Sequence, residues 1–474
     1  MYQCIACRGN LIDESPSIKI CSHCGTSYPI INGISFFLLP DPFSSLQGFV
    51  MEMEEAKAAL TKINQSLEDF ERCSDTGTFE RRIRTIKEGI DGNIRVLEKS
   101  CQPIMDFLQN RTRQDNALAW SSVKSGFTFH DMLPYFYQDW FGTPDFSEVR
   151  KLFAKTLDEH CKDRESVAVL GAGACGLLYN ISDNFQVSYG VDLSLPTLLS
   201  AKMLIEGEAL TFHLQTADWH YIELASPKPT ENDIRYIVSD VMNMPFESAS
   251  LSVVITQYML DIASNPKRLS EEIFRVLKPD GMWINFSNPF RVLGDPVELG
   301  WRKLNELPDF FKKMGFEPVS MEIEHFTLLN VEKICNETGN TKQLVHFLTL
   351  RKSQDIPDFS KNEKSIQRFF KQNDNIWHEI PEIVKGRELD FVRRRSFDEL
   401  GRVRESLEIS LAGHFFSIPS NFAMLLETIF ECINGNNSLR EIFAVLQQNN
   451  IGLSEVEFLQ LIYTLNIQHY LIKL

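Results

Sequence analysis

Three glycines follow a short apolar run near the middle of the chain. Val167–Leu170 is apolar, and Gly171, Gly173 and Gly176 come next with the spacing G-x-G-x-x-G. Such a run predicts a buried parallel strand. Glycines permit a sharp turn with positive φ, where a ligand can lie directly against the backbone. The expected ligand is a nucleotide or a nucleoside.

Acidic residues end the next two predicted strands. Asp192 stands 16 residues after Gly176. A carboxylate there can accept hydrogen bonds from both ribose hydroxyls, as in dinucleotide and S-adenosylmethionine sites. Asp240 suits the exocyclic amine of an adenine that lies against an apolar wall, which Val241 and the Met244-Pro245-Phe246 segment provide. A Pro-Asp-Gly turn then joins a helix to the strand ending near Asn285.

This ordered set resembles the class I methyltransferase domain, whose cofactor is S-adenosylmethionine; a nicotinamide dehydrogenase is the alternative. Strands and helices alternate over 166–352, which predicts a parallel sheet covered on both faces. The fold class expected is therefore α/β with a Rossmann-like sheet. The strands are placed at 167–170, 186–191, 236–239, 251–256, 282–286 and 345–351.

Several segments are similar to successive motifs of the carnosine N-methyltransferase family. They are Gln138-Asp139-Trp140, Val191-Asp192-Leu193-Ser194, Thr256–Asp261, Leu277–Asn285 and Val297-Glu298-Leu299 with Phe316. The resemblance covers roughly residues 46–352. It implies that the cofactor is lined by Gln138, Gly171, Gly173, Gly176, Asp192, Asp240, Val241 and Gln257.

The same resemblance makes Asp261 the residue that holds an imidazole of the methyl acceptor. An Asp that accepts one imidazole N–H fixes the tautomer and directs the other nitrogen at the methyl group. Alternatively, Asp261 caps the helix that begins near Asn265. The stretch after Ile284-Asn285 lacks the family's His, and the family's Arg near Gln138 is also missing, so carnosine itself is not implied as the acceptor.

Four cysteines near the N-terminus form two C-x-x-C pairs, Cys4 with Cys7 and Cys21 with Cys24. Together they offer a tetrahedral set of four thiolates for zinc, and such a closed shell is structural rather than catalytic. The alternative is a small hairpin of four thiols without metal. The segment resembles the zinc ribbon related to the tRNA-methyltransferase activator protein.

The chain divides into five expected parts: a zinc ribbon (1–44), a helical extension or lid (45–145), the methyltransferase domain (146–352), a linker (353–400) and a winged-helix-like domain (401–474). The last part has the pattern of a hairpin, three helices and a final strand. It resembles the PqqD-like modules that bind precursor peptides. Peptide binding or dimerisation is expected of it.

The net charge and the composition limit which binding partners are expected. The formal net charge is −16, which argues against nucleic acid as the main partner. No signal peptide or long apolar span is found, and a cytoplasmic location is expected. The sequence thus predicts an S-adenosylmethionine-dependent methyltransferase that acts on a nitrogen of a small molecule or peptide. The alternatives are a peptide natural-product tailoring methyltransferase and a non-catalytic scaffold on a degenerate fold.

Overall fold

The fold is seen in a computed structural model of the 474-residue chain. It describes residues 2–39, 42–73, 79–109, 129–140, 144–208, 210–213, 226–228, 230–287, 307–327, 342–353, 369, 374–384, 389–397, 403–411, 414–418, 420–449, 451–468 and 471–474. None of the helices in these ranges has the length and apolar character needed to cross a membrane.

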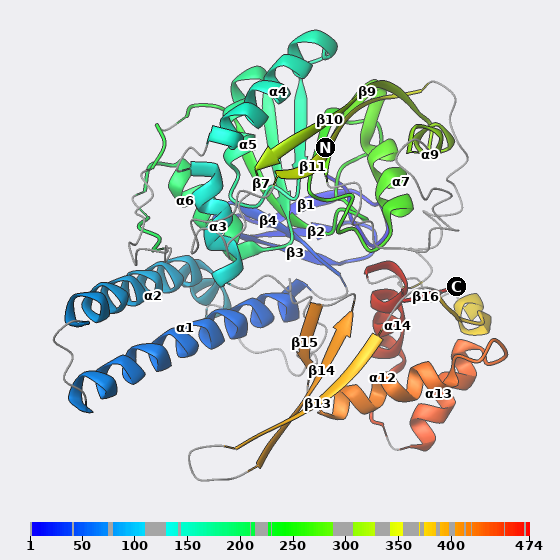
Figure 1. Ribbon diagram of the computed structural model, residues 1–474. Helices are drawn as coiled ribbons and strands as arrows, with labels where there is room; N and C mark the ends of the chain where they lie inside the picture. The colour runs from blue at the N-terminus through cyan, green and yellow to red at the C-terminus, as the bar shows by residue number, and fades with distance from the viewer. Residues whose placement is uncertain are drawn as a thin grey trace.

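A large mixed sheet forms the centre of the molecule (Figure 1). Its parallel core contains β5 (Ser166–Leu170), β6 (Val187–Asp192), β7 (Ile234–Ser239), β8 (Leu251–Gln257) and β9 (Leu277–Ser287). Next to β9 lie the antiparallel strands β11 (Lys342–Lys352) and β10 (Phe316–Thr327). The six strands expected from sequence are confirmed, and β10 is an additional one.

Helices cover both faces of this sheet. The helices α4 (Pro144–His160), α5 (Gly176–Ile181) and α6 (Leu195–Ile205) share one apolar cluster with Val167, Val169 and Ile255. On the other face, α7 (Pro266–Val276) and α9 (Leu307–Lys313) pack with Ala168 and Val254. Because successive strand residues point to opposite faces, continuous apolar strands are required here. The short 3-10 turn η2 (Ser182–Asn184) follows α5.

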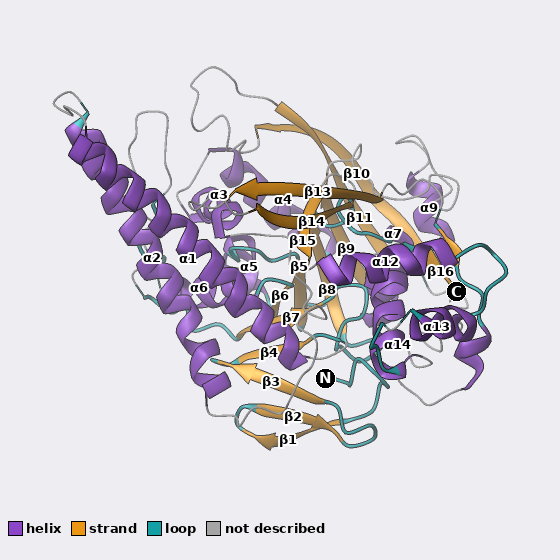
Figure 2. Cartoon of the chain, turned by 90° about the horizontal axis from the view of Figure 1, so that it is seen from below, coloured by secondary structure: helices purple, strands orange, loops and turns teal. Residues whose placement is uncertain are grey.

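The N-terminal strands extend the same sheet. They are β1 (Leu11–Ser15), β2 (Ile18–Cys21), β3 (Ser27–Ile31) and β4 (Ile34–Phe37). β4 runs parallel to β7, with Phe37 opposite Ser239. Figure 2 shows these strands in line with the central ones. The cysteine-bearing segment is therefore continuous with the central sheet.

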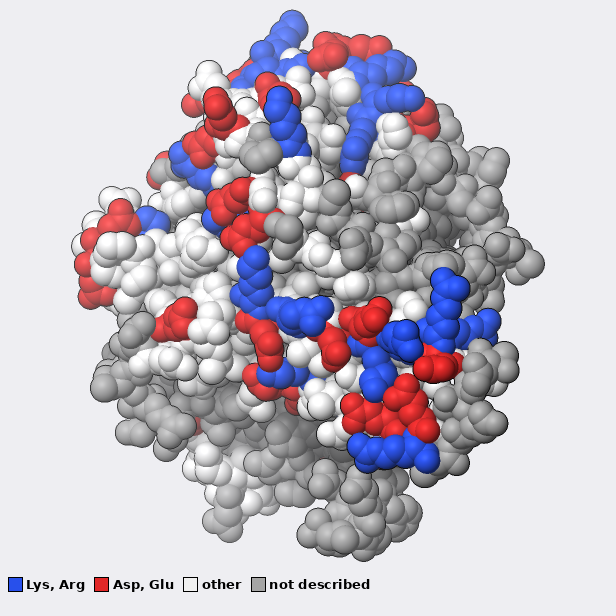
Figure 3. Space-filling model, turned by 90° about the vertical axis from the view of Figure 1, so that its left-hand side faces the viewer, with Lys and Arg blue, Asp and Glu red and all other residues white. Residues whose placement is uncertain are grey.

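Two long helices, α1 (Pro42–Cys73) and α2 (Glu80–Gln109), form a hairpin beside the sheet. The hydroxyls of Ser100 and Ser200 lie 2.8 Å apart and join α2 to α6. Lys57 pairs with Glu98 across the hairpin. Figure 3 shows positive and negative side chains interleaved on one face of the molecule. At the start of α2, Glu80, Arg81, Arg82 and Arg84 are all exposed and form a solvated face.

The C-terminal part contains a three-stranded antiparallel sheet and several helices. The strands are β13 (Leu389–Phe397), β14 (Val403–Leu411) and β15 (His414–Ile418). The helices are α12 (Ser420–Cys432), α13 (Leu439–Gln448) and α14 (Glu455–Tyr463), which continues as the π-helix η5 (Thr464–Gln468). The short strand β12 (Glu382–Ile383) pairs with β16 (Ile472–Lys473), and η4 (Asp374–His378) precedes them.

Local signals in this region are confirmed. β14 and β15 form the expected hairpin, and Ser438 and Ser454 are N-caps in full capping boxes. The expected linker 353–400 contains η4, β12 and β13 where the structure describes it. The winged-helix arrangement itself is not established and stays a prediction.

Candidate functional site

The glycine loop joins β5 to α5 in a left-handed path. Gly171 and Gly173 have φ of 69° and 50°, and Cys175 has φ of 62°. The backbone N–H groups of Gly171 and Ala172 both donate to the carbonyl oxygen of Val191. The loop is therefore fixed to the end of β6.

Cys175 lies within this loop, and its thiol packs against the backbone of β6 at Gly190. Burial raises the pKa of the thiol, which therefore stays protonated.

Asp192 holds the glycine loop and the next helix together. Its Oδ2 accepts from the Gly173 N–H at 2.9 Å, and its Oδ1 accepts from the Ser194 N–H at 2.8 Å. Burial raises the pKa of this carboxyl group, and the two backbone hydrogen bonds oppose that rise. Each carboxylate oxygen keeps a further lone pair. The residue can thus still accept hydrogen bonds from ligand hydroxyls.

The helix α3 (Phe129–Trp140) contacts the glycine loop from the other side. Asp139 Oδ2 accepts from the Gly176 N–H at 2.8 Å, at the first turn of α5. The indole N–H of Trp140 donates to the Ala174 carbonyl oxygen at 2.9 Å. Gln138, the predicted cofactor residue, is half-buried next to Asp139. The helix α3 therefore packs directly against the glycine loop.

Burial raises the pKa of Asp139 to about 7, and the Gly176 N–H and Arg150 oppose the rise. Sequence reasoning did not assign Asp139, although it lies between Gln138 and Trp140. Its signal was its position next to a predicted site residue.

Asp240 and Val241 lie just beyond the end of β7, and both are buried. Asp240 Oδ1 accepts from the Met242 N–H at 2.9 Å. Burial raises the pKa of Asp240 to about 6, while the positive charge of Arg268 opposes the rise. Because β7 neighbours β6, Asp240 stands at the same edge of the sheet as Asp192.

The loop after β8 lies against the glycine loop. A Cβ built on Gly171 would come within 2.5 Å of Met259 Sδ and 3.4 Å of the Gln257 carbonyl oxygen. Tyr258 adopts a φ of 52°, which is uncommon for a residue with a Cβ. Asp261 is buried in this loop. The loop thus brings Gln257 and Met259 to the glycine turn, and Asp261 follows in the same loop.

Asp261 does not cap α7. The N-cap is Asn265, whose side chain accepts from the Arg268 N–H at 3.0 Å. The alternative reading of Asp261 as the helix cap is therefore wrong. Its burial in the loop after β8 needs another explanation.

The four cysteines converge as the sequence predicts. Their sulfur atoms all lie within 4.8 Å of one another. Sγ of Cys4 is 3.6 Å from that of Cys24, and Sγ of Cys7 is 3.5 Å from that of Cys21. A tetrahedral metal–thiolate shell has such spacings. The donor set therefore fits a metal ion, with the Tyr28 hydroxyl 3.1 Å from the Cys4 sulfur.

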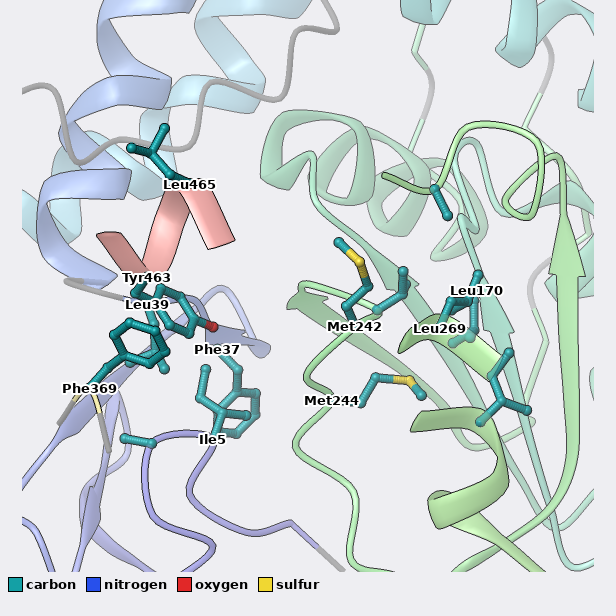
Figure 4. Close-up of a cluster of buried hydrophobic side chains, with 14 of the residues drawn as sticks. Ile5, Phe37, Leu39, Leu170, Met242, Met244, Leu269, Phe369, Tyr463 and Leu465 are labelled. Atoms are coloured by element: carbon teal, nitrogen blue, oxygen red, sulfur yellow. The ribbon is translucent and has the colours of Figure 1, made fainter. Parts of the chain in front are cut away.

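The C-terminal part packs on the loop that follows β7. The Asn243 side-chain amide lies 3.5 Å from the Tyr463 hydroxyl and donates to the Ile5 carbonyl oxygen at 3.1 Å. Figure 4 shows Tyr463 near Leu39 and Phe369, with its hydroxyl directed toward the side of Met242 and Met244. Three distant segments of the chain thus meet at this loop.

Comparison with known proteins identifies the central part. Residues 169–284 match the model of a methyltransferase domain family. The chain contains an S-adenosylmethionine-dependent methyltransferase domain. The matched segment of this methyltransferase contains the glycine loop, Asp192, Asp240 and Asp261. No curated protein matches the chain.

Several solved structures are similar to part of the methyltransferase. One is a SAM-dependent methyltransferase from Methanosarcina mazei, 14% identical, covering 42% of this chain and 97% of that one, with a TM-score of 0.31. Another is phosphoethanolamine N-methyltransferase 2 of Haemonchus contortus, 16% identical, covering 43% and 53%, with a TM-score of 0.30. A third is a complex between the Haloferax volcanii Trm112 methyltransferase activator and a methyltransferase, 15% identical, covering 44% and 97%, with a TM-score of 0.29. Likenesses with scores this low support no conclusion by themselves.

Proposed function

We propose that this methyltransferase transfers a methyl group to a nitrogen atom, with an imidazole as the favoured acceptor group, in a small molecule or a peptide. S-adenosylmethionine supplies a methyl group on a positively charged sulfur when it is bound. A neutral nitrogen lone pair can attack such a carbon without a strong base. The protein's task is then to position the acceptor and to exclude water.

The arrangement of Asp192 carries the cofactor part of this proposal. Its two oxygens bridge Gly173 and Ser194, so that the glycine loop is held ready before any ligand binds. In the proposal, Asp192 accepts from the ribose hydroxyls, and Asp240 with Val241 receives the adenine. The glycine loop meets the amino acid tail, next to Gln138 and Gln257.

Asp261 is the proposed acceptor anchor. It is buried, and Met259 of the same loop touches the glycine turn. A carboxylate at this place would accept one N–H of an imidazole and direct the other ring nitrogen toward the methyl group. Asn265 already caps α7, which supports a role for Asp261 outside helix capping.

Two variants separate the two roles. Asp192→Ala should weaken S-adenosylmethionine binding at least about tenfold in calorimetry, because hydrogen bonds to a charged group are lost. Asp261→Ala should keep the cofactor affinity and lower turnover in a mass-spectrometric screen of imidazole compounds and short peptides. Asp309→Ala, an exposed site on α9, serves as the control. Unchanged turnover of Asp261→Ala would reject this residue as the anchor, and a wild-type chain that binds no cofactor would reject the whole proposal.

We also propose that zinc is the ion held by Cys4, Cys7, Cys21 and Cys24. Four thiolates favour zinc, and they leave no open position for a substrate. The ion would then stabilise the N-terminal strands and take no part in methyl transfer.

A peptide acceptor is the second candidate. The contact of Tyr463 with Asn243 favours it, because the C-terminal part then touches the loop that carries Asp240. A peptide bound by the C-terminal part would be delivered close to the cofactor site. In the same screen, this candidate predicts that histidine-containing peptides of several residues are methylated faster than free imidazole compounds.

A further inference from the structure

His346 is a buried histidine to which the proposed methyl transfer assigns no role. It lies on β11 and is 1% exposed. Neither ring nitrogen has a hydrogen-bond partner among the residues that the structure describes. Burial lowers the pKa of the ring, which favours the neutral form with one donor and one acceptor. An unsatisfied pair of buried polar atoms is strongly unfavourable, so a partner is expected.

A row of buried hydrogen bonds ends at Ser287, the residue that pairs with His346 across the sheet. The Trp283 indole N–H donates to Thr256 Oγ1 at 2.8 Å, and that hydroxyl donates to Asn285 Oδ1 at 2.8 Å. The Asn285 side-chain amide in turn donates to Ser287 Oγ at 2.9 Å. Ser287 pairs with His346 across β9 and β11. Because directly paired residues present their side chains to the same face, Ser287, the last member of the row, and His346 are neighbours on one face of the sheet.

The row ends at the carboxyl edge of the parallel strands. Ser287 is the last residue of β9, and the Tyr258 N–H donates to the Phe286 carbonyl oxygen at 2.8 Å. The loop that carries Asp261 therefore starts beside the end of the row. Ligands of open α/β sheets bind just beyond this edge.

Thr349 provides a contrast on the same strand. Its hydroxyl is also buried and has no partner among the described residues. It pairs with Ile284, three positions further into β9, and side-chain alternation places it on the opposite face from His346. Its cross-strand neighbour on β10 is Ser320. His346 differs because it lies at the carboxyl ends of the parallel strands, beside the last member of a polar row.

We propose that His346 is a second anchor for the methyl acceptor, and that the acceptor carries a polar group beside its imidazole. This inference rests on the proposed function, in which Asp261 holds the imidazole. The neutral ring of His346 would hydrogen-bond the second polar group, an amine, amide or carboxyl function. The acceptor class is therefore a histidine-like molecule rather than a bare azole.

This second anchor can be tested by measuring how L-histidine and imidazole bind to the protein loaded with S-adenosylhomocysteine. Calorimetry should show that wild type binds L-histidine about tenfold more tightly than imidazole, the gain expected from one or two satisfied hydrogen bonds. His346→Leu should remove this preference and leave the imidazole affinity unchanged. His346→Gln should restore part of it, because an amide offers a donor and an acceptor. Thr349→Val is the matched control and should keep the preference.

Two results would overturn the inference. One is that wild type and His346→Leu prefer L-histidine over imidazole by the same factor. The other is the absence of any L-histidine binding to wild type that has bound S-adenosylhomocysteine. Both leave the methyltransferase assignment standing, whereas failure to bind S-adenosylhomocysteine would reject the proposed function itself.

Discussion

The guanidinium of Arg8 donates a hydrogen bond of 2.8 Å to the carbonyl oxygen of Met244. It also donates to Asn243 Oδ1 at 2.8 Å and lies 3.4 Å from Glu272 Oε1. Arg8 directly follows Cys7, has a φ of 59°, and its N–H donates to the Cys4 carbonyl oxygen. The turn of the first cysteine pair therefore positions the loop that carries Asp240.

Replacement of Arg8 should weaken both stability and cofactor binding. The pKa of buried Glu272 is lowered to about 2 by Arg275, Arg8 and Arg268 in that order. In Arg8→Ala this carboxylate loses one charge partner, which costs about 1–3 kcal/mol. The affinity for S-adenosylmethionine should fall several-fold, as measured by calorimetry. Lys19→Ala, at the surface of the N-terminal strands, is the control. Unchanged affinity in a destabilised Arg8→Ala would show that the loop does not depend on this contact.

Loss of one cysteine should release the metal. Elemental analysis should find one zinc per wild-type chain and none in Cys21→Ala, because three thiolates leave the shell incomplete. The melting temperature should fall in this variant and in chelated wild type. Cys161→Ala, a buried cysteine far from the cluster in sequence, should keep its zinc. Full zinc in Cys21→Ala would contradict the four-thiolate site.

Local patterns made much of the fold predictable. The apolar run before Gly171 predicted β5, and the hairpin pattern in the C-terminal part predicted β14 and β15. These signals lie within a few residues of the element that they define. β10 lacked such a signal, because Pro318 interrupts it and Met321 and Ile323 point to solvent.

Contacts between distant segments were not predictable. The pairing of β4 with β7 joins residues that are 202 positions apart in the chain, such as Phe37 and Ser239. Two residues of the candidate site were missed in the sequence for the same reason, because only contacts between distant segments reveal them. Asp139 and His346 became visible only when folding placed one against Gly176 and the other opposite Ser287. Their residue types alone gave no hint of burial.

Gly176→Ala should be strongly destabilising. A Cβ at this position would lie 2.5 Å from the Asp139 Cβ and 2.8 Å from its Oδ2, so α3 would have to move away from α5. Overpacking of this kind costs about 1–3 kcal/mol. Urea denaturation should show the loss, and cofactor affinity should fall with it. Gly452→Ala is the matched control, since a Cβ there meets nothing within 4 Å. Equal stability of the two variants would contradict the tight contact.

Asp139 should make the protein less stable as the pH rises. Its pKa in the folded protein is raised to about 7, well above the value of an unfolded aspartate. Between about pH 4 and 7 the folded state therefore binds more protons than the unfolded state, and the free energy of unfolding falls with increasing pH. Burial without a full charge partner is the cause.

Asp139→Asn should remove this slope, because the amide oxygen can still accept from the Gly176 N–H but carries no charge. Urea denaturation at pH 5 and pH 8 should show wild type losing more stability than the variant, by at most about 3 kcal/mol, because about two pH units separate pH 5 from the raised pKa of about 7. Asp240, whose pKa is raised to about 6, contributes with the same sign in both proteins and cancels in the difference. Asp309→Asn, at an exposed site, should follow wild type. A slope unchanged in Asp139→Asn would mean that Asp139 is already ionised in the folded protein at pH 5.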